Sequence, residues 1–129
     1  MLYLLDTDVI IDYLKGRAKL SDNILNNAFI SVITYAELEY GFKKADLDTG
    51  LLEDFLRNHN IQILDLNKKI VSTYVDIRLA LEKGGTKLAD FDILIAATAI
   101  VNNLKLVTRN LKHFGRIKYL SLYKDDKKL

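Results

Sequence analysis

The fold is decided first by a stretch at the start of the chain, Leu2-Tyr3-Leu4-Leu5-Asp6-Thr7-Asp8. Its first four residues form a short apolar run, which predicts a buried β-strand. The polar residues that follow predict the start of a helix that continues to Lys15. Ligands bind at the carboxyl ends of the strands in open α/β sheets, so Asp6 stands where functional side chains gather.

The rest of the chain alternates between strand-like and helix-like segments. We expect further strands over residues 28–32, 61–66, 105–108 and 117–122. We expect helices from residue 21 or 22 to 27, from Thr34 onward, over 48–58, from Asn67 to Gly84-Gly85, and over 90–103. The last of these is apolar nearly all round and should be buried. Strands separated by helices predict an α/β fold whose central, mostly parallel sheet is covered by helices on both faces.

Composition predicts one globular domain over residues 1–129. Half of the residues are hydrophobic and 28% are charged, and the net charge of +2 does not by itself indicate a nucleic-acid partner. The absence of cysteine excludes disulfides, thiolate metal sites and a cysteine nucleophile. Because no apolar run is long enough for a signal peptide or a membrane span, we expect a cytoplasmic protein without membrane contact. Residues 124–129 are charged and are expected to form a loose tail.

Four acidic or amide side chains stand at strand–helix junctions that are spread along the whole chain: Asp6, Glu37, Asp92 and Asn110. At an effective dielectric constant of ~20, two carboxylates ~5 Å apart repel each other by about 3 kcal/mol. A divalent cation removes that repulsion, so the pattern indicates metal-dependent chemistry. Oxygen ligands without cysteine favour Mg²⁺ or Mn²⁺ over zinc.

Each carboxylate also has a purely structural interpretation. Asp6 is a good helix N-cap. Glu37 and Thr34 match a Ser/Thr-x-x-Glu capping box, in which the glutamate bonds back to the cap residue. If Asp90 caps the buried helix, Asp92 falls in its first turn, where the helix dipole favours negative charge. The ordered combination is more specific than any single member.

Four stretches of sequence carry a family resemblance. They are Leu4-Leu5-Asp6-Thr7-Asp8; Ile30-Ser31-Val32-Ile33-Thr34 with Glu37-Leu38; Asp92-Ile93-Leu94-Ile95-Ala96-Ala97-Thr98-Ala99; and Leu106-Val107-Thr108-Arg109-Asn110 with His113-Phe114. In this order, and over nearly the whole chain, they resemble the PIN domain of VapC-like toxin ribonucleases. The resemblance implies a three-layer PIN-like fold with a central, mostly parallel β-sheet flanked by helices.

The resemblance also implies roles for individual residues. Asp6, Glu37 and Asp92 correspond to the catalytic carboxylates that bind Mg²⁺ or Mn²⁺. Many members have a further aspartate where this chain has Asn110, which implies a less acidic second metal site. Asp90 is the candidate substitute for that missing charge. The auxiliary polar residues are then Asp8, Thr108 and Asn110.

Partners are also implied by the resemblance. They are an RNA substrate, a second copy of the chain in a homodimer, and an antitoxin that lies across the helices near the site. Apolar residues that the antitoxin could cover are Leu38, Tyr40, Phe42, Leu51, Leu52 and Phe55, of which we expect at least half to be core. Candidate contacts to RNA phosphates are Lys43, Lys44, Arg109, Lys112, Arg116 and Lys118, each of which could equally be solvated surface. His59 and His113 are expected to be structural.

The main hypothesis is a metal-dependent endoribonuclease that acts as the toxin of a toxin–antitoxin pair. A first alternative is a catalytically weakened PIN domain that only binds RNA or protein, which Asn110 suggests. A second is a haloacid-dehalogenase-like phosphatase, from Asp6-Thr7-Asp8 after a strand, although Ile10 and the chain length argue against it. A third is a phospho-receiver domain with Asp6, Asp65 and Thr108. Two expected helices after the second strand argue against that alternative.

Overall fold

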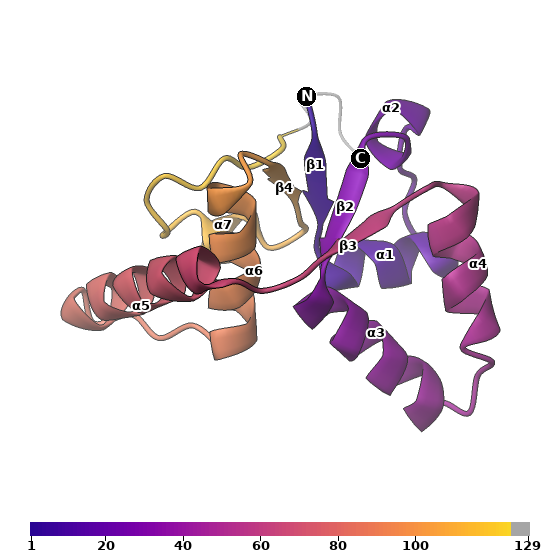
Figure 1. Ribbon diagram of the computed structural model, residues 1–129, viewed down its shortest axis with the longest axis horizontal. Helices are drawn as coiled ribbons and strands as arrows, with labels where there is room; N and C mark the ends of the chain where they lie inside the picture. The colour runs from indigo at the N-terminus through magenta and orange to yellow at the C-terminus, as the bar shows by residue number, and fades with distance from the viewer. Residues whose placement is uncertain (125–129) are drawn as a thin grey trace.

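A computed structural model describes residues 1–124 of the chain, and its centre is a four-stranded sheet in which every pair of neighbouring strands is parallel. The strands are β1 (Tyr3–Leu5), β2 (Ala28–Ser31), β3 (Gln62–Leu64) and β4 (Lys105–Val107), and their order is β3-β2-β1-β4 (Figure 1). The prediction of an α/β fold with a parallel sheet is confirmed. The predicted tail lies, from residue 125 on, outside the described residues.

Helices cover both faces of the sheet, so the molecule has three layers (Figure 1). One face is covered by α1 (Thr7–Leu14), α2 (Asp22–Leu25), α3 (Val32–Lys44) and α4 (Gly50–Asn58). The other is covered by α5 (Lys68–Lys83), α6 (Asp90–Val101) and α7 (Leu111–Phe114). Both α3 and α4 lie between β2 and β3, as expected, and this breaks the strict alternation that a phospho-receiver domain would show.

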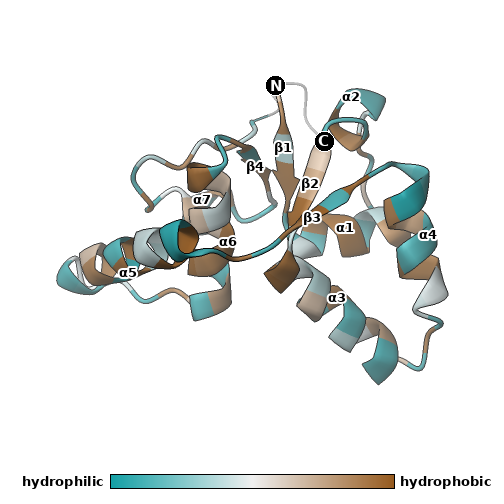
Figure 2. Ribbon diagram, in the orientation of Figure 1, coloured by the Kyte–Doolittle hydropathy of each residue, from teal (hydrophilic) through white to brown (hydrophobic). Residues whose placement is uncertain are grey.

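Alternation along β1 explains why its residues are all apolar. Tyr3 and Leu5 face the core beneath α1–α4, whereas Leu4 faces the core beneath α5–α7. The helix α6 is buried as predicted, with Ile95 and Ala96 fully inaccessible to solvent. Mostly hydrophobic colours along β1, β2 and α6 show the same pattern in Figure 2. Within residues 1–124, no helix is long and apolar enough to cross a membrane.

The ends of two helices differ from the prediction, and this affects the site. Helix α3 begins at Val32, because the Ser31 hydroxyl caps it by accepting a hydrogen bond from the Ile33 N–H at 3.0 Å. The predicted capping box of Thr34 and Glu37 is therefore wrong. Helix α6 has Ala89 at its N-cap position and no side-chain cap, so Asp90 does not cap it.

The last predicted strand is also wrong. Within residues 117–122 only Leu122 forms a β-bridge, with Leu106 of β4. Tyr119 has φ +68°, a left-handed conformation that an extended strand excludes. The apolar residues of this segment instead pack from turns, and Ile117 is buried in the core beneath α5–α7.

Candidate functional site

Asp6 is the buried centre of the site. It follows β1 directly and caps α1, with Oδ1 accepting a hydrogen bond from the Thr7 N–H at 2.8 Å. Its Oδ2 accepts from the hydroxyl of Thr108, at the end of the neighbouring strand β4, also at 2.8 Å. The residue is only 5% exposed. The capping interpretation is confirmed, and the same hydrogen bonds fix the carboxylate at the carboxyl edge of the sheet.

The surroundings of Asp6 disfavour its negative charge. Burial raises the pKa of Asp6 from 3.8 to about 6, against the opposing effect of the hydrogen bonds from Thr108 and Thr7. The nearby carboxylates of Asp8 and Asp92 raise this pKa further. No lysine or arginine within residues 1–124 forms an ion pair with Asp6. A metal ion would stabilise the ionised form of a buried carboxylate that has like charges nearby and no ion pair.

Glu37 reaches the end of β1 through Thr7 rather than through a capping box. Its Oε1 accepts a hydrogen bond from the Thr7 hydroxyl at 2.6 Å, and that hydroxyl also lies 3.4 Å from the hydroxyl of Thr34. Thr34 is fully buried. Thr7 therefore links α1 to α3 beside Asp6, a role that sequence reasoning missed. Its signal was a small hydroxyl residue between two aspartates at a strand end.

Asp92 approaches the site from the first turn of α6, and its charge contributes to the raised pKa of Asp6. Its Oδ2 lies 3.0 Å from Nε2 of His113, on α7. The expectation that His113 is merely structural thus overlooked its contact with a predicted metal ligand. His59 packs edge-on against Phe55 and Tyr13, as a structural residue would.

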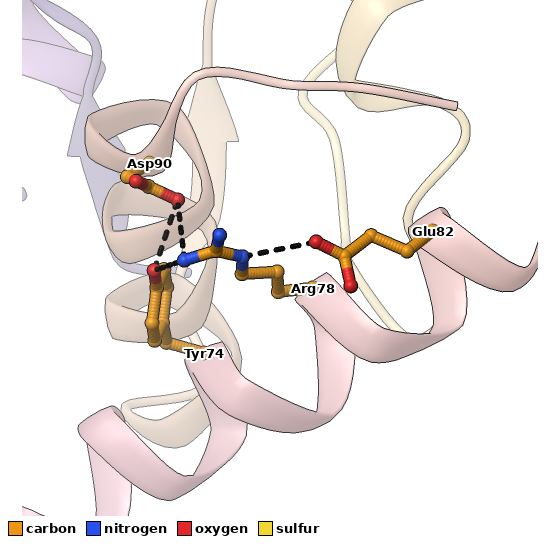
Figure 3. Close-up of polar contacts among 4 residues, drawn as sticks. All are labelled: Tyr74, Arg78, Glu82 and Asp90. Carbon is orange, nitrogen blue, oxygen red and sulfur yellow. Dashed lines mark hydrogen bonds and ion pairs between the residues drawn. The ribbon is translucent and has the colours of Figure 1, made fainter. Parts of the chain in front are cut away.

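Asp90 is not brought to this group, although it lies two residues before Asp92. Its Oδ1 accepts a hydrogen bond from the Tyr74 hydroxyl at 2.9 Å and lies 3.4 Å from the guanidinium of Arg78 (Figure 3). Arg78 in turn pairs with Glu82, so the cluster joins α5 to the start of α6. The predicted substitute for Asn110 therefore has a different set of partners.

The auxiliary polar residues hold the loop after β4. The Thr108 hydroxyl donates to Asp6 and accepts from the Asn110 N–H at 3.0 Å, so it joins the turn after β4 to the buried carboxylate. The side chain of Asn110 does not cap α7, and the residue is exposed. Asp8 is exposed on α1 and acts on Asp6 through its charge.

One ion pair at the edge of the site was not anticipated. Arg109, a predicted phosphate contact, pairs with Asp12 of α1, which is 8% exposed and was not singled out in the sequence. Of the other predicted contacts, two already have partners and three are exposed. Lys43 forms an ion pair with Glu39, Lys44 lies over the Tyr40 ring, and Lys112, Arg116 and Lys118 are exposed in or after α7.

The donor atoms fit a hard divalent cation, because Asp6, Glu37 and Asp92 offer only carboxylate oxygens. Within residues 1–124, however, no group of three or more acidic or histidine side chains is close enough to hold a metal ion as it stands. One oxygen of Glu37 is occupied by Thr7 and one of Asp92 by His113. Glu37 and Asp92 each have a second oxygen to offer, and each oxygen of Asp6 accepts one hydrogen bond and keeps a further lone pair. The residues therefore suit a metal in kind but do not form a closed ligand cage.

Comparison with known proteins gives consistent matches over most of the chain. A family model described as PIN domain matches residues 3–118. Ribonuclease VapC2 from Rickettsia felis is 36% identical over 138 residues, covering 98% of this chain and 100% of that protein. A crystal structure of VapBC2 from Rickettsia felis bound to a DNA fragment from their promoter matches with a TM-score of 0.84 and 32% identity, over 98% of this chain and 100% of that one. A toxin–antitoxin complex from Klebsiella pneumoniae matches with a TM-score of 0.69 and 26% identity, over 95% and 99% of the two chains.

The raised pKa of Asp6 predicts a pH dependence of stability in metal-free buffer. Between its unfolded value of 3.8 and its folded value of about 6, the native state binds a proton that the unfolded state has lost. Stability from this group is therefore fully present below pH ~4 and is lost as pH rises through ~6, by up to about 3 kcal/mol. Asp6→Asn removes this loss. The free energy of unfolding of the variant, relative to that of wild type, should therefore increase as the pH rises from 4 to 7.

The measurement is urea unfolding with EDTA at several pH values. Asp65→Asn, which removes an exposed carboxylate outside the site, is the control. A difference between Asp6→Asn and wild type that stays constant from pH 4 to 7 would contradict the prediction.

Proposed function

The chain belongs to the PIN-domain family, and on that premise we propose that it is a Mg²⁺- or Mn²⁺-dependent endoribonuclease, the toxin of a toxin–antitoxin pair. The observation that carries the proposal is the buried carboxylate of Asp6, which forms no ion pair within residues 1–124. The charge of Asp92 raises its pKa, and Glu37 is hydrogen-bonded to the adjoining Thr7. The relatives support it, since the Rickettsia felis protein is named a ribonuclease and the Klebsiella pneumoniae complex is described as toxin–antitoxin.

Asp6, Glu37 and Asp92 would hold the metal through their carboxylate oxygens. When bound, such an ion lowers the pKa of a water molecule and stabilises charge on the phosphate under attack. The protein residues around it orient the ligands. Thr108 and the Thr7 N–H fix both oxygens of Asp6, the Thr7 hydroxyl fixes one oxygen of Glu37, and His113 restrains Asp92.

RNA is the proposed substrate, and the cytoplasm, where RNA is made and used, is the proposed compartment. A phosphodiester brings negative charge to an acidic site, so cations must lie at its edge. Arg109 is held there by Asp12, and Lys112 is exposed on α7 beside His113. Lys43, Lys44 and Arg116 would act only on more distant phosphates.

Two exposed apolar surfaces support the proposed protein partners. On α3, on α4 and between them, Tyr40, Leu47 and Leu51 are each more than half exposed, while Leu38, Leu52 and Phe55 are core, as expected for at least half of this set. We assign the exposed members to the antitoxin. On α5, Val71, Val75 and Leu79 are exposed at a spacing of four residues, which places them on one helix face. We assign this face to the homodimer.

Cleavage assays test the catalytic set. We expect Asp6→Asn, Glu37→Gln and Asp92→Asn each to lower the rate of RNA cleavage in Mg²⁺ or Mn²⁺ by at least about 100-fold, because loss of a metal ligand should exceed the 10–100-fold cost of losing an outer partner. His113→Gln should lower the rate of RNA cleavage by about 10–100-fold, because His113 is an outer partner of the proposed ligand Asp92.

The matched control for these variants is Asp90→Asn, because Asp90 is on the same helix turn as Asp92 but faces Tyr74 and Arg78. It should cleave at close to the wild-type rate. Unchanged cleavage in both Asp6→Asn and Asp92→Asn would overturn the proposed catalytic set. RNA binding by wild type with no cleavage in either metal would favour a PIN domain that only binds RNA.

Thermal melting tests the metal without requiring activity. Free Mg²⁺ at 100 times its dissociation constant should stabilise the wild type by about 2.7 kcal/mol, because the ion binds the folded state alone. Asp6→Asn and Glu37→Gln should lose this gain, whereas Asp65→Asn should keep it. An equal gain in all four proteins would indicate unspecific ionic stabilisation.

Single substitutions can separate the two apolar surfaces. Leu51→Asp should weaken binding to the antitoxin encoded beside this gene by at least about tenfold, since a charge replaces an apolar contact. Leu79→Asp should instead shift the protein from dimer to monomer in size-exclusion chromatography. Titration calorimetry measures the first effect. If Leu51→Asp disrupts the dimer and Leu79→Asp weakens antitoxin binding, the assignment of the two surfaces is wrong.

A further inference from the structure

A cavity opens beside the proposed catalytic carboxylates and has no part in the chemistry described above. It has a volume of about 570 Å³ and lies between α1, the loop that follows it, and the end of β4. Thr108 lines it, and the Thr108 hydroxyl is the group that donates to Asp6 at 2.8 Å. The cavity therefore begins one side chain away from the buried carboxylate.

The cavity combines an apolar lining with a cationic one. Its apolar residues are Val9, Leu20 and Val107, of which Val9 and Val107 are almost fully buried. Its charged residues are Arg17, Lys19 and Arg109, and no acidic side chain lines it. An anion with an apolar body is the kind of ligand that matches both parts.

Asp12 organises the cationic side. Its carboxylate binds Arg109, and its backbone carbonyl accepts hydrogen bonds from the N–H groups of Arg17 at 2.7 Å and Ala18 at 3.3 Å. Gly16, with φ +72°, supplies the left-handed turn that this loop requires. Thus one buried aspartate places two arginines at a common cavity.

A neighbouring polar cavity shares both arginines but differs in charge. It has a volume of about 460 Å³, and its other lining includes Asp8 and Asp12. The negative charges of those carboxylates offset the positive charges of the two arginines in the lining of this polar cavity. Of these two cavities, the one with the apolar lining therefore has the more positively charged lining.

We propose that this apolar and cationic cavity, lined by Arg17, Lys19 and Arg109, binds one nucleotide of the RNA strand next to the bond that is cut. The inference rests on the proposed ribonuclease function. Its volume lies within the roughly 300–1,000 Å³ of small-molecule sites. The base lies on Val9, Leu20 and Val107, and the phosphate contacts the cations. Arginine suits both tasks, because its planar guanidinium binds phosphate oxygens in pairs and stacks on bases.

This arrangement also predicts the state of the RNA. A base enters such a cavity only when it is unstacked and unpaired, so the site selects single-stranded segments. An acidic peptide would match the cations but would leave the apolar lining without a partner.

The test uses full-length protein in EDTA and adenosine monophosphate as the probe, followed by backbone amide NMR. We expect shifts at Val9, Leu20 and Val107, and binding about tenfold tighter than that of ribose 5-phosphate, which lacks the base, or adenosine, which lacks the phosphate. Arg17→Gln should weaken the nucleotide about tenfold, as expected for one lost charge-assisted hydrogen bond. Arg57→Gln is the matched control, because Arg57 is exposed on α4, pairs with Asp54 and does not line the cavity.

A second variant keeps the test independent of charge. Ala18 lines the cavity and is half-buried, so Ala18→Leu should fill the base site. It should weaken adenosine monophosphate but leave ribose 5-phosphate unchanged, and the same spectra report whether the variant is folded. Equal binding of the two probes by wild type, or equal effects of Arg17→Gln and Arg57→Gln, would overturn the proposal.

Two further outcomes separate the possible explanations. Hexaglutamate that binds more tightly than the nucleotide, with the same shifts, would assign the cavity to an acidic peptide and overturn the proposal. Nucleotide binding with the expected variant effects, but without RNA cleavage in metal, would support the cavity while overturning the ribonuclease function.

Discussion

The structure depends on placing one carboxylate, that of Asp6, in a buried position at the end of the central strand. Within residues 1–124, the carboxylate has two hydrogen-bond donors and no lysine or arginine in an ion pair with it. Those donors come from the start of α1 and the end of β4. Both segments must therefore pack beside β1 before both carboxylate oxygens of Asp6 are hydrogen-bonded. Burial and neighbouring carboxylates nevertheless leave its pKa at about 6. The fold therefore tolerates an electrostatically unfavourable group where the chemistry needs it.

This arrangement would link binding of the proposed metal ion to proton release. A carboxylate must be ionised to bind a metal, and the free protein holds part of the Asp6 population protonated near neutral pH. Metal affinity should thus rise with pH across this range. The hydroxyls of Thr7 and Thr108 are the nearest partners of the site's carboxylates. They orient Glu37 and Asp6 without adding charge. A lysine or arginine in their place would add a positive charge.

The sequence predicted what depends on local pattern and failed where distant packing decides. Apolar runs and their ends predicted four of the five expected strands correctly, together with the buried α6 and the positions of Asp6 and Asp92. Asp90 and Asp92 share one helix turn, and only the packing of α5 sends the first toward Tyr74. The bond between Thr7 and Glu37 spans 30 residues, and the pair of Asp12 and Arg109 spans 97. No local pattern identifies the distant partner in either pair.

The pairing of the first strand with the last has a consequence for how the protein is made. Asp6 and its partner Thr108 are 102 residues apart in the sequence, and β1 pairs with β4 along its whole length. Contacts so distant in sequence form late in folding. A nascent or prematurely terminated chain lacks the strand that completes the site. A chain that ends before β4 also lacks the Thr108 hydroxyl that orients Asp6, so this edge of the sheet forms only after both strands have been synthesised.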